Sequence, residues 1–198
     1  MNNYRVNIWK NNILCCFSIH TNLRKKSLSG LINLKLMAKI ILLLGGNENN
    51  TSEAFKTTIE RIGQKIGTVD NRSGLYTSPP WGFDHPNWFL NQVLEVESSL
   101  PPVQILQQTR LIEQELGRKI KTKDRYEARL IDIDILFIDH LIIDKPDLQI
   151  PHPRLHLRRF TLLPLDELMP GFIHPVLKKT IHVLLQECRD TGDVRRVD

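Results

Sequence analysis

Two aspartates placed two residues apart, Asp132 and Asp134, are the side chains in this sequence best suited to chemistry. They lie in RLIDIDILFID (residues 129–139), whose apolar residues alternate as in a β-strand. Residues i and i+2 of a strand point to the same face, with Cα atoms roughly 6.6 Å apart. Two carboxylates at that spacing can bind one cation, or a pair of metal ions about 3.5–4 Å apart. The alternative is a solvent-facing strand edge that carries two solubilising acids.

The apolar neighbours of the two aspartates favour the metal site. One face of the expected strand carries only large apolar residues, namely Ile131, Ile133, Ile135 and Phe137. The face with the aspartates carries three more, namely Leu130, Leu136 and Ile138. Solvated strand faces rarely alternate with large apolar side chains, so we expect both faces to be largely covered.

A basic segment leads into the aspartate pair. It contains six cationic residues: Arg118, Lys119, Lys121, Lys123, Arg125 and Arg129. Mg²⁺ bound by one or two carboxylates usually shares its shell with phosphate oxygens, and Arg suits bidentate phosphate contacts. For Lys119 and Lys121 a solvated loop is the simpler interpretation. No G-x-x-x-x-G-K-[ST] motif occurs, so a phosphate ligand must be bound by this loop and by metal ions.

The stretch PHPRLHLRRF (151–160) is the second dense segment. His152 and His156 could bind a metal, but with no third His or Cys nearby a structural or nucleotide-contacting role is favoured. Arg158 and Arg159 beside Phe160 predict a phosphate contact next to an aromatic wall. The alternative is a surface turn that leads into a helix.

The elements that must position these residues alternate along the chain. We expect strands in KIILLLGGN (39–47), weakly up to Tyr76, in WFLNQVLEVESS (88–99) and in 129–139, with a short return strand in HLIID (140–144). Helices are expected in 51–67, from Val103 to Leu116, and near 161–169 and 176–187. This order predicts an α+β fold, a ferredoxin-like βαββαβ core whose antiparallel sheet is covered by helices on both faces.

Composition separates the first 36 residues from the rest of this 198-residue chain. Residues 1–36 contain six Lys or Arg and no acid, while the whole chain has a net charge of +5, so the remainder carries −1. That balance argues against a nucleic-acid binder. We expect 1–36 to be a poorly ordered extension preceding the true start at Met37; an organellar transit peptide is the alternative. Residues 37–198 form the expected single domain.

Cysteine usage and hydropathy restrict the cellular setting. Of three cysteines, two adjacent ones lie in the extension and only Cys188 lies in the body, so no disulfide framework is expected. This pattern fits a reducing, cytoplasmic location. The apolar run in the extension is too short and too polar to span a membrane.

Several motifs, in this order and spacing, resemble the 6-hydroxymethyl-7,8-dihydropterin pyrophosphokinase (2-amino-4-hydroxy-6-hydroxymethyldihydropteridine diphosphokinase) family. They are LLLGGN (42–47), LYTSPPWG (75–82), FLNQV (89–93), IEQELGR (112–118), RLIDIDIL (129–136) and PHPRLHLRRF (151–160). The resemblance covers Met37 to the C-terminal region. It implies transfer of pyrophosphate from ATP to the pterin hydroxymethyl group, with release of AMP, in folate biosynthesis.

The resemblance also implies residue roles. Asp132 and Asp134 would bind two Mg²⁺ ions, and the catalytic arginines would be Arg118 and Arg129. The ATP contacts would be Leu106, Arg118, Tyr126, Arg129, Ile135, His152 and Arg158, with Tyr126 standing where an indole is often found. The pterin slot would be formed by Ser78, Pro79, Pro80, Trp81, Phe89, Asn91 and Phe160.

Two other functions compete with this enzyme. Ferredoxin-like sheets also form RRM-type RNA-binding modules, but no RNP1-like pattern occurs in this sequence. The other possibility is a lapsed nucleotide-binding scaffold, which the intact aspartate pair and arginines disfavour. We expect a monomer that binds small molecules and neither nucleic acid nor membrane.

Overall fold

The structure, a computed structural model, describes residues 37–48, 50–82, 86–117 and 130–197, and these residues form one compact unit. The main sheet is built from β1 (Ala38–Gly46), β2 (Thr68–Arg72), β3 (Tyr76–Ser78), β4 (Phe89–Ser98), β5 (Asp132–Ile138) and β8 (Arg195–Arg196). A separate hairpin consists of β6 (Ile143–Lys145) and β7 (Leu148–Ile150). The helices are α1 (Thr51–Lys65), α2 (Pro102–Glu115), α3 (Arg159–Leu168) and α4 (Ile181–Glu187), with a short 3₁₀ turn at Leu155–Leu157.

The main sheet is antiparallel and is centred on two long strands. Its order is β5-β1-β4-β3-β8, and β2 also pairs with β4. β2 pairs with the second half of β4 and β3 with its first half, so the chain passes from one to the other along the same edge. The predicted mixture of helices and antiparallel sheet is confirmed.

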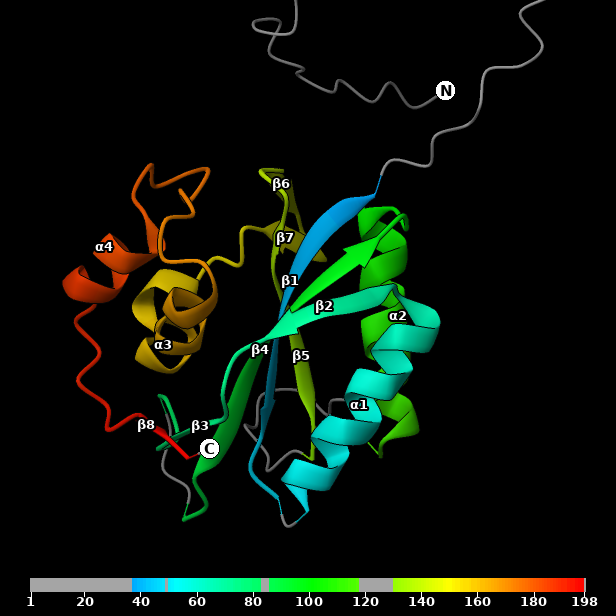
Figure 1. Cartoon of the computed structure of the whole chain (residues 1–198), viewed down its shortest axis with the longest axis horizontal. Coiled ribbons are helices and arrows are strands. Elements are labelled where there is room, and N and C mark those ends of the chain that lie inside the picture. The colour runs from blue at the N-terminus through cyan, green and yellow to red at the C-terminus, as the bar shows by residue number, and fades with distance from the viewer. Residues whose placement is uncertain (1–36, 49, 83–85, 118–129, 198) are drawn as a thin grey trace, which may run out of the picture. The chain divides into compact units, whose positions relative to one another are not determined.

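Helices cover both faces of the sheet, as Figure 1 shows: α1 and α2 lie on one side and α3 and α4 on the other. The sequence of β1 accounts for this coverage, because its apolar residues from Ile40 to Leu44 are all buried. Ile40, Leu42 and Leu44 pack with α1 and α2, whereas Ile41 and Leu43 pack with α3 and α4. A strand that is buried on both faces needs this continuous apolar sequence.

A β-bulge in β5 corrects the predicted faces of that strand. Leu42 of β1 pairs with Ile135 and Ile41 pairs with Phe137, so Leu136 is the extra residue. The prediction was right up to Leu136 and wrong for Phe137, which the bulge turns towards α3 and α4, and for Ile138, which packs with α1 and α2. There its ring lies 4.8 Å from that of Phe172, centroid to centroid.

Two expected elements differ in detail, and one strand was not expected. The helix expected over 176–187 begins only at Ile181, after a turn in which Lys178 has φ +57°, and Thr180 caps it by accepting a hydrogen bond from the Val183 N–H. The expected return strand pairs with β7 in the separate hairpin. β8 was not predicted. Among the described residues, no helix has the length and apolarity needed to cross a membrane.

Candidate active site

Asp132 and Asp134 open β5 on the sheet face that α3 and α4 cover further along. Both are half-buried, while Ile133 between them packs with α1 and α2. Asp134 lies opposite Leu43 of β1, which belongs to the α3 and α4 core, and Asp132 lies opposite Gly45. Residues opposite one another in a ladder share a face, so the two carboxylates are on one side, as predicted.

Gly45 leaves open space on that face. Its partner on the other side is Asn91 of β4, so Asp132, Gly45 and Asn91 form one row across three strands. With strands about 4.8 Å apart, Asp132 and Asn91 are about 10 Å from each other. A Cβ at Gly45 would have one described heavy atom within 4 Å, the Asn91 Oδ1 at 3.8 Å. The row therefore carries a carboxylate at one end, an amide at the other and no side chain between.

Arg158, which precedes α3, lies beside the aspartates. Its Nη1 is 3.5 Å from Asp134 Oδ2, and its guanidinium carbon lies 4.9 Å from the Trp81 ring centroid and 5.6 Å from that of Phe160. Arg158 Nε is buried and has no hydrogen-bond partner among the described residues. A buried donor in this condition is one that a bound anion can satisfy.

His152 is held against β5 at the bulge. Its backbone N–H donates to the Leu136 carbonyl at 3.0 Å, and its Nε2 lies 3.9 Å from Asp134 Oδ2. Burial first, and then the positive charge of Arg158, lower the pKa of His152 to about 4. Nδ1 accepts a hydrogen bond from the Arg154 N–H at 3.2 Å, so the neutral ring carries its proton on Nε2. His152 thus presents an uncharged N–H donor on the side of Asp134.

The amide of Asn91 is fixed by β3. Its Nδ2 donates to Ser78 Oγ at 3.0 Å and to the Tyr76 carbonyl at 3.3 Å, and both Asn91 and Ser78 are 2% exposed. These two bonds set the amide orientation and leave Oδ1 as the atom nearest Gly45. The amide is therefore a rigid polar group suited to recognising a polar ring edge.

Other residues implied by the resemblance fall into three groups. Half-buried Pro79, Pro80 and Phe89 lie in or beside the loop that follows β3 and so accompany Ser78. Leu106 and Ile135 lie in the core on the opposite, α1 and α2 face, so the structure does not bring them onto the face of the aspartates. Arg118, Tyr126 and Arg129 lie outside the described residues.

Glu113 of α2 was missed by sequence reasoning. It is 3% exposed and accepts a hydrogen bond at 2.8 Å from the backbone N–H of Ile133, the residue between the two aspartates. An acid directly after Ile112, on the buried face of a helix, was the signal that could have revealed it. Its carboxylate fixes the backbone that carries Asp132 and Asp134.

The donor set of this site fits a hard cation. Among the described residues, no group of three or more His, Cys, Asp or Glu side chains forms a closed metal cage. Two carboxylates on one strand are instead the arrangement by which Mg²⁺ is bound together with substrate phosphates. Fold and site together define a small α+β protein with a carboxylate pair, a guanidinium, aromatic rings and a fixed amide on one sheet face.

Comparison with known proteins gives this arrangement a family. The sequence model of the 7,8-dihydro-6-hydroxymethylpterin-pyrophosphokinase (HPPK) family matches residues 41–170. The chain therefore belongs to this enzyme family, as the resemblance predicted.

Several curated relatives carry the name 2-amino-4-hydroxy-6-hydroxymethyldihydropteridine pyrophosphokinase, and two of them show the level of similarity. The protein from Porphyromonas gingivalis is 38% identical over 143 residues, which cover 70% of this chain and 95% of the relative. The one from Aquifex aeolicus is 36% identical over 145 residues, covering 73% and 89%. The crystal structure of Plasmodium falciparum HPPK-DHPS with pteroate matches at a TM-score of 0.65 and 16% identity, over 77% of this chain and 44% of that one. This likeness shows the fold, and the chain spans less than half of that solved chain.

Proposed function

We propose that this chain transfers the pyrophosphoryl group of ATP to the hydroxymethyl group of 6-hydroxymethyl-7,8-dihydropterin and releases AMP. The observation that carries the proposal is the meeting of Asp134 with Arg158 on a sheet face that also holds the Asn91 amide. Family membership supplies the reaction, and this face supplies groups of the right chemistry for both substrates.

The pterin slot is proposed at the Asn91 end of the row. A pterin is a flat ring with polar edges, so it requires aromatic faces and a fixed hydrogen-bonding group. Trp81 and Phe160 supply rings close to the Arg158 guanidinium, and Asn91 supplies the amide. Ser78 orients that amide, while Pro79, Pro80 and Phe89 would complete the walls.

The triphosphate is proposed at the Asp132 end. Two Mg²⁺ ions bound by Asp132 and Asp134 would neutralise phosphate charge during the transfer. Arg158 contributes a guanidinium whose buried Nε lacks a described partner, and His152 contributes a neutral Nε2–H. Because His152 is uncharged near neutral pH, it donates to a phosphate oxygen without repelling Arg158.

The adenine is proposed to reach around the edge of the sheet. β5 is the last strand in the order, with Ile135 and Leu106 on its α2 side and the aspartates on its other side. A nucleotide that passes along this edge can contact Ile135 and Leu106 with its adenine and the aspartate side with its phosphates, although these residues lie on opposite faces of the sheet. Arg118 and Arg129 keep their proposed roles in stabilising the transferring group, and Tyr126 its role at the nucleotide.

Such a reaction needs positioning and charge stabilisation more than covalent help. We assign no nucleophile, and no dedicated general base, because an alcohol next to bound metal ions is already acidified. The catalytic domain is proposed to span residues 37–198 and to act as a cytoplasmic monomer. Its core of β1, α1, β2, β4, α2 and β5 is proposed to be ferredoxin-like, which the pairing order β5-β1-β4-β2 supports.

The direct test measures AMP release from ATP with and without 6-hydroxymethyl-7,8-dihydropterin. We expect AMP only with the pterin and Mg²⁺ present. Asp134→Ala should abolish turnover while the thermal melting temperature stays within a few degrees of wild type, because the side chain is half-buried and carries no core packing. Substantial AMP production by a folded Asp134→Ala variant would overturn the metal assignment.

A further inference from the structure

A cavity of about 350 Å³ lies away from the proposed active site, at the edge of the sheet where the chain passes from β2 to β3. The link Ser73–Leu75 runs alongside β4 here, because Ser73 N–H donates to the Val93 carbonyl at 2.9 Å. The other walls come from the first half of α1, from Gln92, and from Glu167 and Arg196. This volume falls within the range of small-ligand pockets.

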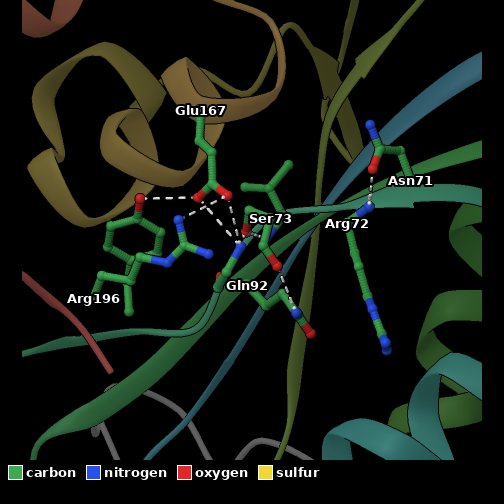
Figure 2. Close-up of polar contacts among 9 residues, drawn as sticks. Asn71, Arg72, Ser73, Gln92, Glu167 and Arg196 are labelled. Carbon is green, nitrogen blue, oxygen red and sulfur yellow. Dashed lines mark hydrogen bonds and ion pairs between the residues drawn. The ribbon is translucent and has the colours of Figure 1, made fainter. Parts of the chain in front are cut away.

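The only acid among the described residues that line this cavity is already paired. Glu167 accepts hydrogen bonds from the Gly74 N–H at 3.2 Å and from the Tyr76 hydroxyl at 2.9 Å. Dashed lines mark the polar contacts of this carboxylate in Figure 2. Arg196 Nη1 lies 3.4 Å from the same carboxylate. Glu167 therefore contributes little uncompensated negative charge to the cavity.

Two cationic lining residues are available to a ligand. The Arg72 side chain has no hydrogen-bond or ion-pair partner among the described residues, although its backbone N–H donates to Asn71 Oδ1 and its backbone pairs with Leu94 of β4. Lys56 pairs with Glu53 at 3.1 Å, but the two side chains are 69% and 71% exposed, so this pair contributes little. The cavity thus favours an anionic group near Arg72 and Lys56.

Gln92 adds a second, independent group that a ligand can contact. It is 6% exposed, and its Nε2 donates to the Ser73 carbonyl at 2.7 Å, which fixes the orientation of the amide. Figure 2 shows its Oε1 turned away from Ser73, and this oxygen accepts no hydrogen bond from any described residue. Unlike Arg158 Nε, this oxygen is open to solvent, so a ligand N–H or O–H can take the place of water there.

The remaining wall is apolar. Phe55 is 2% exposed, and Ile59 and Leu75 are half-buried. A fitting ligand therefore combines an anionic end, a hydrogen-bond donor and an apolar, flat body. A nucleoside monophosphate has all three, and the proposed reaction releases one.

We propose that this cavity is a second ligand site that binds a nucleoside monophosphate, AMP in the first instance. Arg72 and Lys56 hold its phosphate, the base lies against the apolar wall, and the exocyclic amine donates to Gln92 Oε1. The choice of AMP rests on the proposed function; the need for an anion with a donor group rests on the cavity alone.

The test is isothermal titration of AMP into the full chain whose active site is saturated with the pterin, Mg²⁺ and a non-hydrolysable ATP analogue. We expect one AMP site to remain under these conditions. Arg72→Gln should weaken it at least about tenfold, since a charge-assisted hydrogen bond contributes about 1.5–3 kcal/mol. Arg110→Gln makes the same charge change at an exposed position of α2 and should leave the affinity unchanged. No remaining AMP binding, or binding indifferent to Arg72→Gln, would overturn the proposal.

The donor is tested from the ligand side, which avoids any folding defect. Purine riboside 5′-monophosphate lacks the exocyclic amine, and adenosine lacks the phosphate; both should bind more weakly than AMP. Equal affinity for either compound would contradict the corresponding contact. Turnover is measured separately and should be normal in Arg72→Gln, so a failure of the proposed reaction remains distinguishable from a failure of this site.

Discussion

Two glycines, Gly45 in β1 and Gly67 just before β2, should respond in opposite ways to the same added methyl group. At Gly45 a Cβ would meet the Asn91 Oδ1 at 3.8 Å, an ordinary contact, in the space between Asp132 and Asn91. At Gly67, which joins α1 to β2, a Cβ would overlap the Glu97 carbonyl oxygen and lie 2.9 Å from the Ser98 Cβ. The fold thus tolerates a side chain at Gly45, but a bound substrate needs that space to be empty. At Gly67 the fold itself needs the absence of a side chain.

The expected magnitudes follow from these contacts. Gly45→Ala should keep or raise the free energy of unfolding by about 0.5–1 kcal/mol, because Ala loses less backbone entropy than Gly. Its methyl group should crowd bound substrate by about 1–3 kcal/mol, which lowers kcat/KM about 5- to 150-fold. Gly67→Ala should destabilise the fold by about 1–3 kcal/mol and lower Tm by roughly 2–10 °C, with normal kcat/KM per folded molecule.

Thermal melting and steady-state AMP release on both variants check the pair. Wild-type kcat/KM in Gly45→Ala would refute the idea that substrate occupies the row between Asp132 and Asn91. An unchanged Tm in Gly67→Ala would refute the close approach to β4. Loss of Tm in Gly45→Ala instead would mean that the open space has a structural purpose.

Two further perturbations test the surroundings of the site. Glu167→Gln should weaken the hydrogen bonds to the Gly74 N–H and the Tyr76 hydroxyl by about 1–2 kcal/mol in total. Because the Tyr76 carbonyl helps to hold the Asn91 amide, the KM for the pterin should rise while kcat stays the same. Lower stability with an unchanged KM for the pterin would contradict this coupling. Burial lowers the pKa of His174 to about 4, so between pH 6.5 and 4 the unfolded chain binds a proton at this residue that the folded chain does not. The free energy of unfolding should therefore decrease by up to about 3 kcal/mol as the pH falls through this range. His174→Asn, whose side-chain oxygen can accept the same N–H bonds from the following turn, should flatten that dependence in urea denaturation at several pH values.

Local patterns were enough to predict much of the fold. The continuous apolar run of β1, the helical spacing of α1 and the prolines that open α2 are each readable within a few residues, and the structure has all three. The face shared by Asp132 and Asp134 follows from the strand period alone. Family motifs added the roles, which remain proposals for each residue.

What the sequence could not predict depends on pairing between distant segments. The side on which Phe137 packs depends on the register between β5 and β1, which alternation within β5 does not specify. β8 is two residues long and exists because Arg195 and Arg196 pair with β3, more than a hundred residues earlier. The hydrogen bond that orients the Gln92 amide likewise depends on where the Ser73 carbonyl lies.

The bulge at Leu136 has a consequence for anyone redesigning this sheet. Its carbonyl, at the point where the ladder with β1 is interrupted, accepts the His152 N–H and so ties the segment after β7 to the strand that carries the aspartates. Deleting one residue to regularise β5 would make the strand more ideal and would also separate His152 from Asp134. A design procedure that favours regular hydrogen-bonded strands would remove the bulge, and with it the contact between the segment of His152 and the strand of Asp134. A redesign of this protein should therefore keep the bulge.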